Sequence, residues 1–298
     1  KGTKAVITLL ADMTGDGITG DNTLEGNEEA LRAYDLTIEL DQLRFANRVA
    51  GRLADQKSVV NFRETSRDAL AYAIADRMDQ LAFLTLSGVA YTLKTSGALR
   101  TTSSSAGHEL ADLEFASDVS APTTNRHRRW DATNGLSAGD VTALVAADTM
   151  QYKCIVELKA YAKDNYIRGL RGAGGEEVFH MFVTPQQMAK LKLDSDFLSN
   201  VRSAGIRGPK NELFAGSSSV LVDGVVIHEY RHVFNTANAT TGTSSNAGAA
   251  GYKWGADADV NGARALFCGA QALAMADIGL PEIVEDNFDY GYEESMTQ

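Results

Sequence analysis

The sequence is short of cysteine, of proline and of positive charge, and each shortage excludes a class of protein. Its two cysteines, Cys154 and Cys268, are too few for a disulfide framework and indicate a reducing compartment. Four prolines against 27 glycines mean that its flexible stretches are rich in small residues rather than stiff. The 28 Lys and Arg are outnumbered by 39 Asp and Glu, which gives a net charge of −11 and a pI near 5.0. This balance argues against a protein that grips nucleic acid or an anionic membrane surface.

Long apolar runs are missing as well. The longest, such as Ala5–Ala11, fall far short of the roughly 20 residues of a membrane-spanning helix. No basic segment followed by an apolar one marks a signal peptide. What the chain does contain is ordinary for a globular protein, with 44% hydrophobic and 22% charged residues. Its 298 residues fit one large domain or two modest ones.

Two segments near the start read as strands joined by a long connection. Residues 4–11 form a β-rich apolar run, and residues 34–41 alternate apolar with polar positions, the period of a half-buried strand. The Gly-, Asp- and Asn-rich stretch 14–29 between them is much longer than the roughly two to five residues of a tight hairpin. We expect an extended two-stranded arm with a large, mobile tip.

Apolar side chains on such an arm cannot be buried by the arm itself. A two-stranded ribbon is marginally stable alone, so these positions need a partner surface. We therefore take them as candidates for contact between subunits: Val6, Ile7, Leu9, Leu36, Ile38 and Leu40.

A single long helix is predicted over residues 61–87. Apolar residues recur every three or four positions and so fall on one face, and Gly88 is a plausible stop signal. At about 1.5 Å per residue the helix is about 40 Å long, which suits a strut. The apolar stripe consists of Leu70, Ile74, Met78, Leu81, Leu84 and Thr85.

Residues 94–135 are polar and poorly periodic, and we expect loops with short strands there. A capping signal at Ser137 followed by helical spacing predicts a helix from there to Tyr161. Residues 178–183 are typical of a buried strand, which runs into a Thr184–Pro185 helix start. Two strands are predicted around the Asp223–Gly224 turn.

The last part of the chain is also predicted to contain loops, strands and a helix. Ala237–Gly251 is a low-complexity loop. Residues 263–267 and 283–290 read as strands, with a short Ala-rich helix between them. The fold class is α+β, with an elongated part and a compact part.

The sequence His228-Glu229-Tyr230-Arg231-His232 matches the zinc-protease motif H-E-x-x-H. That motif needs a helix, where the two histidines share a face. Here the preceding residues are β-branched, and on a strand the histidines would lie about 13 Å apart at roughly 3.3 Å per residue. A half-exposed strand explains the segment better than a zinc site.

The arm tip contains Gly15-Asp-Gly17-Ile-Thr-Gly20, a G-x-G-x-x-G pattern. A dinucleotide site needs a helix that starts at these glycines, and none is predicted. Asp12, Thr14 and Asp16 partly fit a calcium loop, but Thr23 stands where the bidentate Glu belongs. A flexible tip accounts for both patterns.

The one basic cluster is Arg126-His127-Arg128-Arg129. A solvated loop or an ion pair with an acidic neighbour explains it more simply than contact with phosphate. We also take Arg126, Arg128 and Arg129 as candidates for inter-subunit contact.

Taken in order, these pieces resemble the major capsid proteins of tailed bacteriophages with the Hong Kong 97-like (HK97-like) fold. Their sequences are similar to those of the branch typified by the coat protein of coliphage N4. The resembling stretches, which cover most of the chain, are Gly20–Leu31, Leu36–Arg44, Arg63–Leu70, Asp79–Gly88, Phe182–Gln187, Asn211–Gly216, Gly224–Ile227, Ala265–Ala272 and Asp289–Gly291.

The resemblance divides the chain into parts. Residues 1–52 would be the extended loop (E-loop) that lies over a neighbouring subunit, and residues 53–135 the peripheral domain with its spine helix at about 61–87. Residues 136–223 would be the axial domain, and 224–298 the returning strands of both domains. Related coats carry an arm before the extended loop and more strand after the Asp-Tyr-Gly stretch. Because the chain starts at Lys1 and not at Met, we expect its ends to be trimmed or disordered.

The resemblance also implies the function. The protein would assemble with itself, as hexamers and pentamers, into an icosahedral shell around double-stranded DNA, without a cofactor, a metal or a catalytic site. It would be found in the virion after assembly in the bacterial host cytoplasm, with a portal and decoration or scaffolding proteins as partners and no membrane. Two alternatives stay open: an encapsulin-like nanocompartment shell, distinguished by its cargo, and a zinc metallohydrolase that uses His228, Glu229 and His232.

Overall fold

The structure of the chain is a computed structural model that describes residues 3–48, 57, 61–101, 110–112, 122–172, 175–204, 219–277, 279, 281–288 and 293–297. The described residues fall into two compact units. The first holds the chain up to Ala73 and the segment from Met275 onward; the second holds most of the chain between Ile74 and Ala274. Among the described residues, no helix has the length and apolar character needed to cross a membrane.

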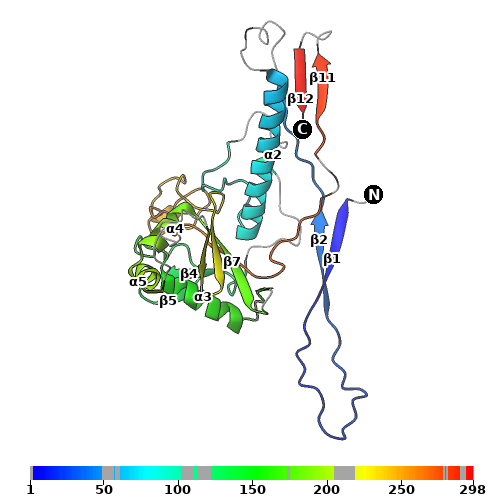
Figure 1. The fold of residues 1–298 in the computed structure, drawn as a ribbon, viewed down its shortest axis with the longest axis vertical. Helices are drawn as coiled ribbons and strands as arrows, with labels where there is room; N and C mark the ends of the chain where they lie inside the picture. Colours follow the sequence, from blue (N-terminus) through cyan, green and yellow to red (C-terminus); the bar gives the residue numbers. More distant parts are fainter. Residues whose placement is uncertain are drawn as a thin grey trace. The chain divides into compact units, whose positions relative to one another are not determined.

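In the first unit, strands β1 (Lys4–Leu10) and β2 (Ala33–Glu39) pair antiparallel along their whole length. We call this pair the ribbon; it appears in blue in Figure 1. Residues 11–32, which connect the two strands, contain neither helix nor strand, as expected for a long arm tip. A second sheet has the order β11-β12-β3 and is formed by β3 (Ala46–Arg48), β11 (Val284–Phe288) and β12 (Glu293–Thr297).

The long helix is confirmed as α2, Phe62–Ser87. Leu70 and Leu84 of the predicted stripe are buried, but Met78 is 44% exposed. The buried face instead includes Ser66, which accepts a hydrogen bond from Asn47 Nδ2, and also Gln80 and Ser87. The buried face of α2 is thus more polar than the sequence pattern indicates.

The second unit is built on a sheet with the order β10-β7-β9-β8, and β6 pairs with β7 at one end. Strands β7 and β9 are parallel and the other pairs are antiparallel. The strands are β6 (Leu170–Arg171), β7 (Glu177–Val183), β8 (Ser219–Val222), β9 (Val225–Glu229) and β10 (Leu266–Cys268).

Three helices cover one face of this sheet (Figure 1). They are α3 (Tyr152–Asp164), α4 (Pro185–Leu193) and α5 (Ser195–Ala204). Ile155, Met188 and Phe197 from the helices pack against alternate residues of the strands, such as Phe179 and Ile227, and form the main core. Burying such side chains contributes about 1.5–3 kcal/mol each, so this face holds the unit together. The short elements outside this core are η1 (Leu110–Asp112), β4 (Arg128–Asp131), β5 (Gly135–Ala138) and η2 (Ser244–Asn246).

Several local predictions are confirmed. Thr184 caps α4 with a capping box, since its hydroxyl accepts from Gln187 N and the Gln187 side chain accepts from Thr184 N. Asp223 and Gly224 both have positive φ and join β8 to β9. The predicted boundary between residues 223 and 224 falls inside this hairpin; the domain limits as a whole stay predictions.

One predicted helix begins too early, and another is wrong. Ser137 does not start a helix: it lies in β5, paired with β4, and the helix begins only at Tyr152. The Asp140 carboxylate accepts from the backbone and hydroxyl of Thr142, which favours a turn over a helix. The predicted Ala-rich helix after β10 is absent from residues 269–277, 279 and 281–283, the part of that segment that the structure describes. The side chains of 270–277 are exposed, and short helices are marginal without packing.

One glycine of the second unit is required by both conformation and space. Gly97 has φ +82°, and a Cβ there would lie 2.7 Å from Asn235 O and 2.8 Å from Thr236 Cα. We expect Gly97→Ala to lower the free energy of unfolding by about 3 kcal/mol, from left-handed strain and overpacking together. Gly175→Ala is the control, because Gly175 has φ +79° but open space around it, so only the backbone strain applies. Equal urea midpoints for the two variants would contradict the role of the close contact.

Candidate functional site: inter-subunit surfaces

The register of the ribbon sorts the candidate contact residues by face. Ile7 lies opposite Leu36, Leu9 opposite Tyr34, and Ala5 opposite Ile38. Because residues opposite one another in an antiparallel pair point to the same side, these six side chains form one face, which we call the apolar face. Tyr34 is 60% exposed, Leu9 43% and Ile7 38%, while Ala5, Leu36 and Ile38 are half-buried, so the apolar face is partly uncovered.

The opposite face of the ribbon mixes polar pairs with apolar side chains, among them Val6 and Leu10, which are 60% and 66% exposed. Lys4 forms an ion pair with Glu39, and the Thr8 hydroxyl donates to Asp35 Oδ1 at 2.8 Å. Val6 lies on this face, opposite Thr37.

Of the predicted residues, the structure therefore brings Ile7, Leu9, Leu36 and Ile38 together and separates Val6 from them. Leu40 follows β2, and its N–H donates to Thr3 O. The sequence-based prediction omitted Tyr34, although Tyr34 precedes Leu36 and Ile38 in the same alternation of residues along the strand.

The Glu29 side chain links the two sides of the arm tip by hydrogen bonds. The Glu29 carboxylate accepts from Thr14 N at 2.8 Å and from Gly15 N at 2.7 Å, and these bonds lower the pKa of Glu29. No helix follows Gly15, Gly17 or Gly20, in agreement with the prediction for the glycine pattern.

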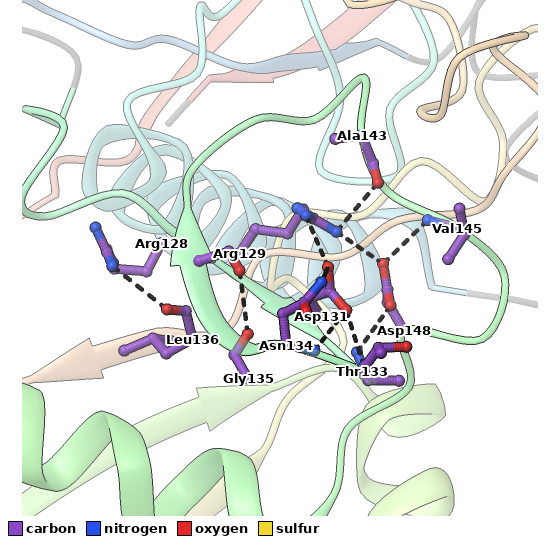
Figure 2. Close-up of polar contacts among 12 residues, drawn as sticks. Arg128, Arg129, Asp131, Thr133, Asn134, Gly135, Leu136, Ala143, Val145 and Asp148 are labelled. Atoms are coloured by element: carbon purple, nitrogen blue, oxygen red, sulfur yellow. Dashed lines mark hydrogen bonds and ion pairs between the residues drawn. The ribbon is translucent and has the colours of Figure 1, made fainter.

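The basic cluster opens the β4–β5 hairpin, and Figure 2 shows the Arg129 guanidinium between two carboxylates. It forms ion pairs with Asp131 and with Asp148, both at 3.1 Å, and donates to Ala143 O. Asp148 is only 2% exposed and also accepts from Val145 N and Ala132 N.

Asp131 closes the turn of the same hairpin. Its carboxylate accepts from the backbone N–H groups of Asn134 and Thr133, which are the main reason that its pKa falls to about 2 (Figure 2). Through its ion pairs with Asp131 and Asp148, Arg129 thus links two loops that are distant in sequence.

The other two arginines of the cluster differ. The Arg128 guanidinium lies 4.7 Å from the centre of the Tyr161 ring and donates to Leu136 O. Arg126 is exposed. Arg128 and Arg129 are therefore occupied within the chain, while Arg126 is the one best placed to meet a second molecule; the inter-subunit role stays a prediction for all three.

The H-E-x-x-H segment is not helical. His228 and Glu229 end strand β9, and His232 lies beyond it, as the strand interpretation predicts. His228 Nε2 is 2.9 Å from Nδ1 of His180, whereas His232 Nε2 is 2.8 Å from Asp76 Oδ1 of α2. The motif histidines thus have separate partners, and within the described ranges no group of three or more His, Cys, Asp or Glu could hold a metal ion.

Cys154 is buried and Cys268 is half-buried. Burial raises the pKa of Cys154, in α3, to about 12, and burial also raises the pKa of Cys268, at the end of β10. Neither thiol is suited to act as a nucleophile.

The family described as phage capsid protein matches residues 1–296. The major capsid protein of Pseudomonas phage KPP25 is 57% identical over 295 residues, which cover 97% of this chain and 74% of that protein.

Solved structures with low sequence identity share the fold. The capsid of Ralstonia phage GP4 has a TM-score of 0.70 at 21% identity, covering 100% of this chain and 77% of that one. The capsid of cyanophage Pam1 has a TM-score of 0.67 at 17% identity, covering 99% and 78%. The predicted α+β fold of HK97-like type is confirmed. The chain belongs to the phage capsid protein family, and its function is structural, as a protein of the virion head shell and not an enzyme.

Proposed function

We propose that the chain closes its shell by laying the apolar face of the ribbon on a neighbouring copy. The observation that carries this is the set of exposed apolar side chains on that face, Ile7, Leu9 and Tyr34, at 38%, 43% and 60% exposure. A two-stranded ribbon alone is marginal in water, and an exposed apolar edge invites pairing. A repeated contact between unlike patches of identical copies generates a closed assembly when its rotation closes.

The remaining parts of the proposal follow from the family resemblance. Copies would form hexamers and pentamers around double-stranded DNA, with a portal and decoration or scaffolding proteins as partners. The net charge of −11 supports a wall that encloses DNA without gripping it. The sequence similarity of the stretches named above supports membership of the branch typified by coliphage N4. Packaged DNA, rather than a packaged protein, would separate this function from an encapsulin-like compartment.

Crosslinking from the ribbon tests the contact. Leu36→Cys introduces a thiol on the apolar face, whereas the native Cys154 is buried and the native Cys268 is half-buried. Particles assembled from mixed light and heavy-isotope chains are treated with a short thiol-reactive photocrosslinker and digested. Mass spectrometry is expected to find crosslinks that join light to heavy peptides.

Thr37→Cys, one residue further on and on the opposite face, is the matched control and should give at least severalfold fewer crosslinks between copies. Crosslinks confined to single chains, or equal yields from both cysteines, would contradict the proposal.

A further inference from the structure

Two histidines face each other on the side of the sheet opposite the main core. His180 is on β7 and His228 on β9, and both are half-buried. Their rings are parallel within 8°, with centroids 5.2 Å apart, and Nδ1 of His180 lies 2.9 Å from Nε2 of His228. A hydrogen bond at this distance needs one nitrogen with a proton and one without. The pair can hold one extra proton, but a second would place N–H groups against each other and bring two positive charges together.

An unbroken series of ring contacts connects this pair to α2. The His228 ring stacks on Phe182, with centroids 5.2 Å apart. Phe182 meets Phe83 of α2 edge-on at 5.6 Å, and Phe83 in turn stacks on Tyr230 at 5.1 Å. Aromatic pairs in these geometries stabilise packing beyond the area they bury, so the position of the His228 ring bears on how α2 packs against the sheet.

We propose that this row is a proton-sensitive joint: when the histidine pair takes up a second proton, its rings separate, and the packing of α2 on the sheet loosens. The row consists of His180, His228, Phe182, Phe83 and Tyr230.

The other charged and titratable groups around the joint lie on α2, β10 and β9, and His232 meets the Tyr230 ring edge-on at 5.5 Å. On α2, Asp79 accepts a hydrogen bond from the Tyr230 hydroxyl, which raises the pKa of Tyr230 and keeps it neutral. Burial raises the pKa of Asp76, but the charges and hydrogen bonds of His232 and Arg231 outweigh it, so that the net pKa is lowered and Asp76 stays charged. On β10, Cys268 lies opposite His180 and is neutral, since burial raises its pKa. Glu229 follows His228 on the opposite side of β9.

The direction of the pH effect follows from His228. Burial lowers its pKa, and the neighbouring His180 lowers it further. A histidine with a depressed pKa is neutral in the closed state, so the closed state is fully stable above the ordinary value of about 6.5 and loses stability as the pH falls below it. Protonation of Asp76 belongs to a lower range, because its pKa lies below its ordinary 3.8.

Amide hydrogen exchange of the full chain, read by mass spectrometry and corrected for the intrinsic pH dependence, tests the joint. Between about pH 7.5 and about pH 5, exchange in α2 from Asp76 to Ser87 and in β9 should accelerate by about tenfold or more. His180→Asn and His228→Gln are the decisive variants. Each puts an amide near the nitrogen that bonds in the pair, so each keeps the contact and removes one titrating ring; both should abolish the acceleration.

His127→Gln is the control, because burial and Arg264 lower the pKa of His127 as well, outside the row. It should leave the acceleration intact. The proposal is overturned if the wild-type chain shows no selective acceleration, if His180→Asn and His228→Gln retain it, or if His127→Gln removes it. Should the row variants fail to fold, deuterium exchange at the imidazole carbons of the wild-type chain gives the pKa of His228 directly, and a value at or above the ordinary one overturns the proposal.

Discussion

Replacing Asp148 by Ala is expected to lower the free energy of unfolding by about 3–5 kcal/mol, because it leaves the Arg129 guanidinium with too few partners inside the protein. Arg129 is 14% exposed and Asp148 2%, so water cannot replace the lost carboxylate. The substitution also leaves Ala132 N and Val145 N without their acceptor. Urea unfolding followed by circular dichroism gives the change in midpoint.

Asp164→Ala is the matched control, since Asp164 is exposed in the last turn of α3. It should change the free energy of unfolding by no more than about 0.5 kcal/mol. A similar small change for Asp148→Ala would show that the Arg129 network does not hold the hairpin.

A charge on the apolar face of the ribbon is expected to abolish shells. Ile7→Asp would place an unpaired carboxylate in the proposed contact, at a penalty of several kcal/mol for every copy. Because each copy repeats the contact, the yield of sedimenting particles should fall by far more than about tenfold. Sedimentation velocity and electron microscopy of the expressed chain measure it.

Val6→Asp also replaces an apolar residue by Asp, one position earlier and on the opposite face beside Lys4, and shells should still form. Equal loss of particles in both variants would mean that the two faces do not differ in function. Thermal unfolding of both variants should match the wild-type chain, since the ribbon lies outside the core of the second unit.

Signals that act within a few residues predict this fold well. The Thr184–Pro185 start of α4 and the Asp223–Gly224 turn are complete in the local sequence, and both are found where expected. The capping signal at Ser137 failed because pairing with β4 decides the structure there.

In the candidate surfaces, too, the features that could not be predicted depend on contacts between residues that are distant in sequence or on strand register. Val6 and Ile7 are adjacent apolar residues, and only the register with β2 tells which of them shares a face with Leu36. The partners of Arg129 could not be predicted either, because Asp148 is 19 residues away along the chain. The partnership of His180 with His228 likewise depends on the parallel pairing of β7 and β9.

The two unlike faces of the ribbon also have a mechanical consequence. Its seven residue pairs lie along one ladder, from Lys4 with Glu39 to Leu10 with Ala33. A pull along the strands loads all of these pairs at once, whereas a pull across them opens one pair after another. A ribbon laid flat on a neighbour, with its apolar face down, meets tension within the shell wall in the first way. With the proposed contact, these fourteen residues would resist stretching of the wall but would separate readily from one end, which would let a misplaced copy detach before the shell closes.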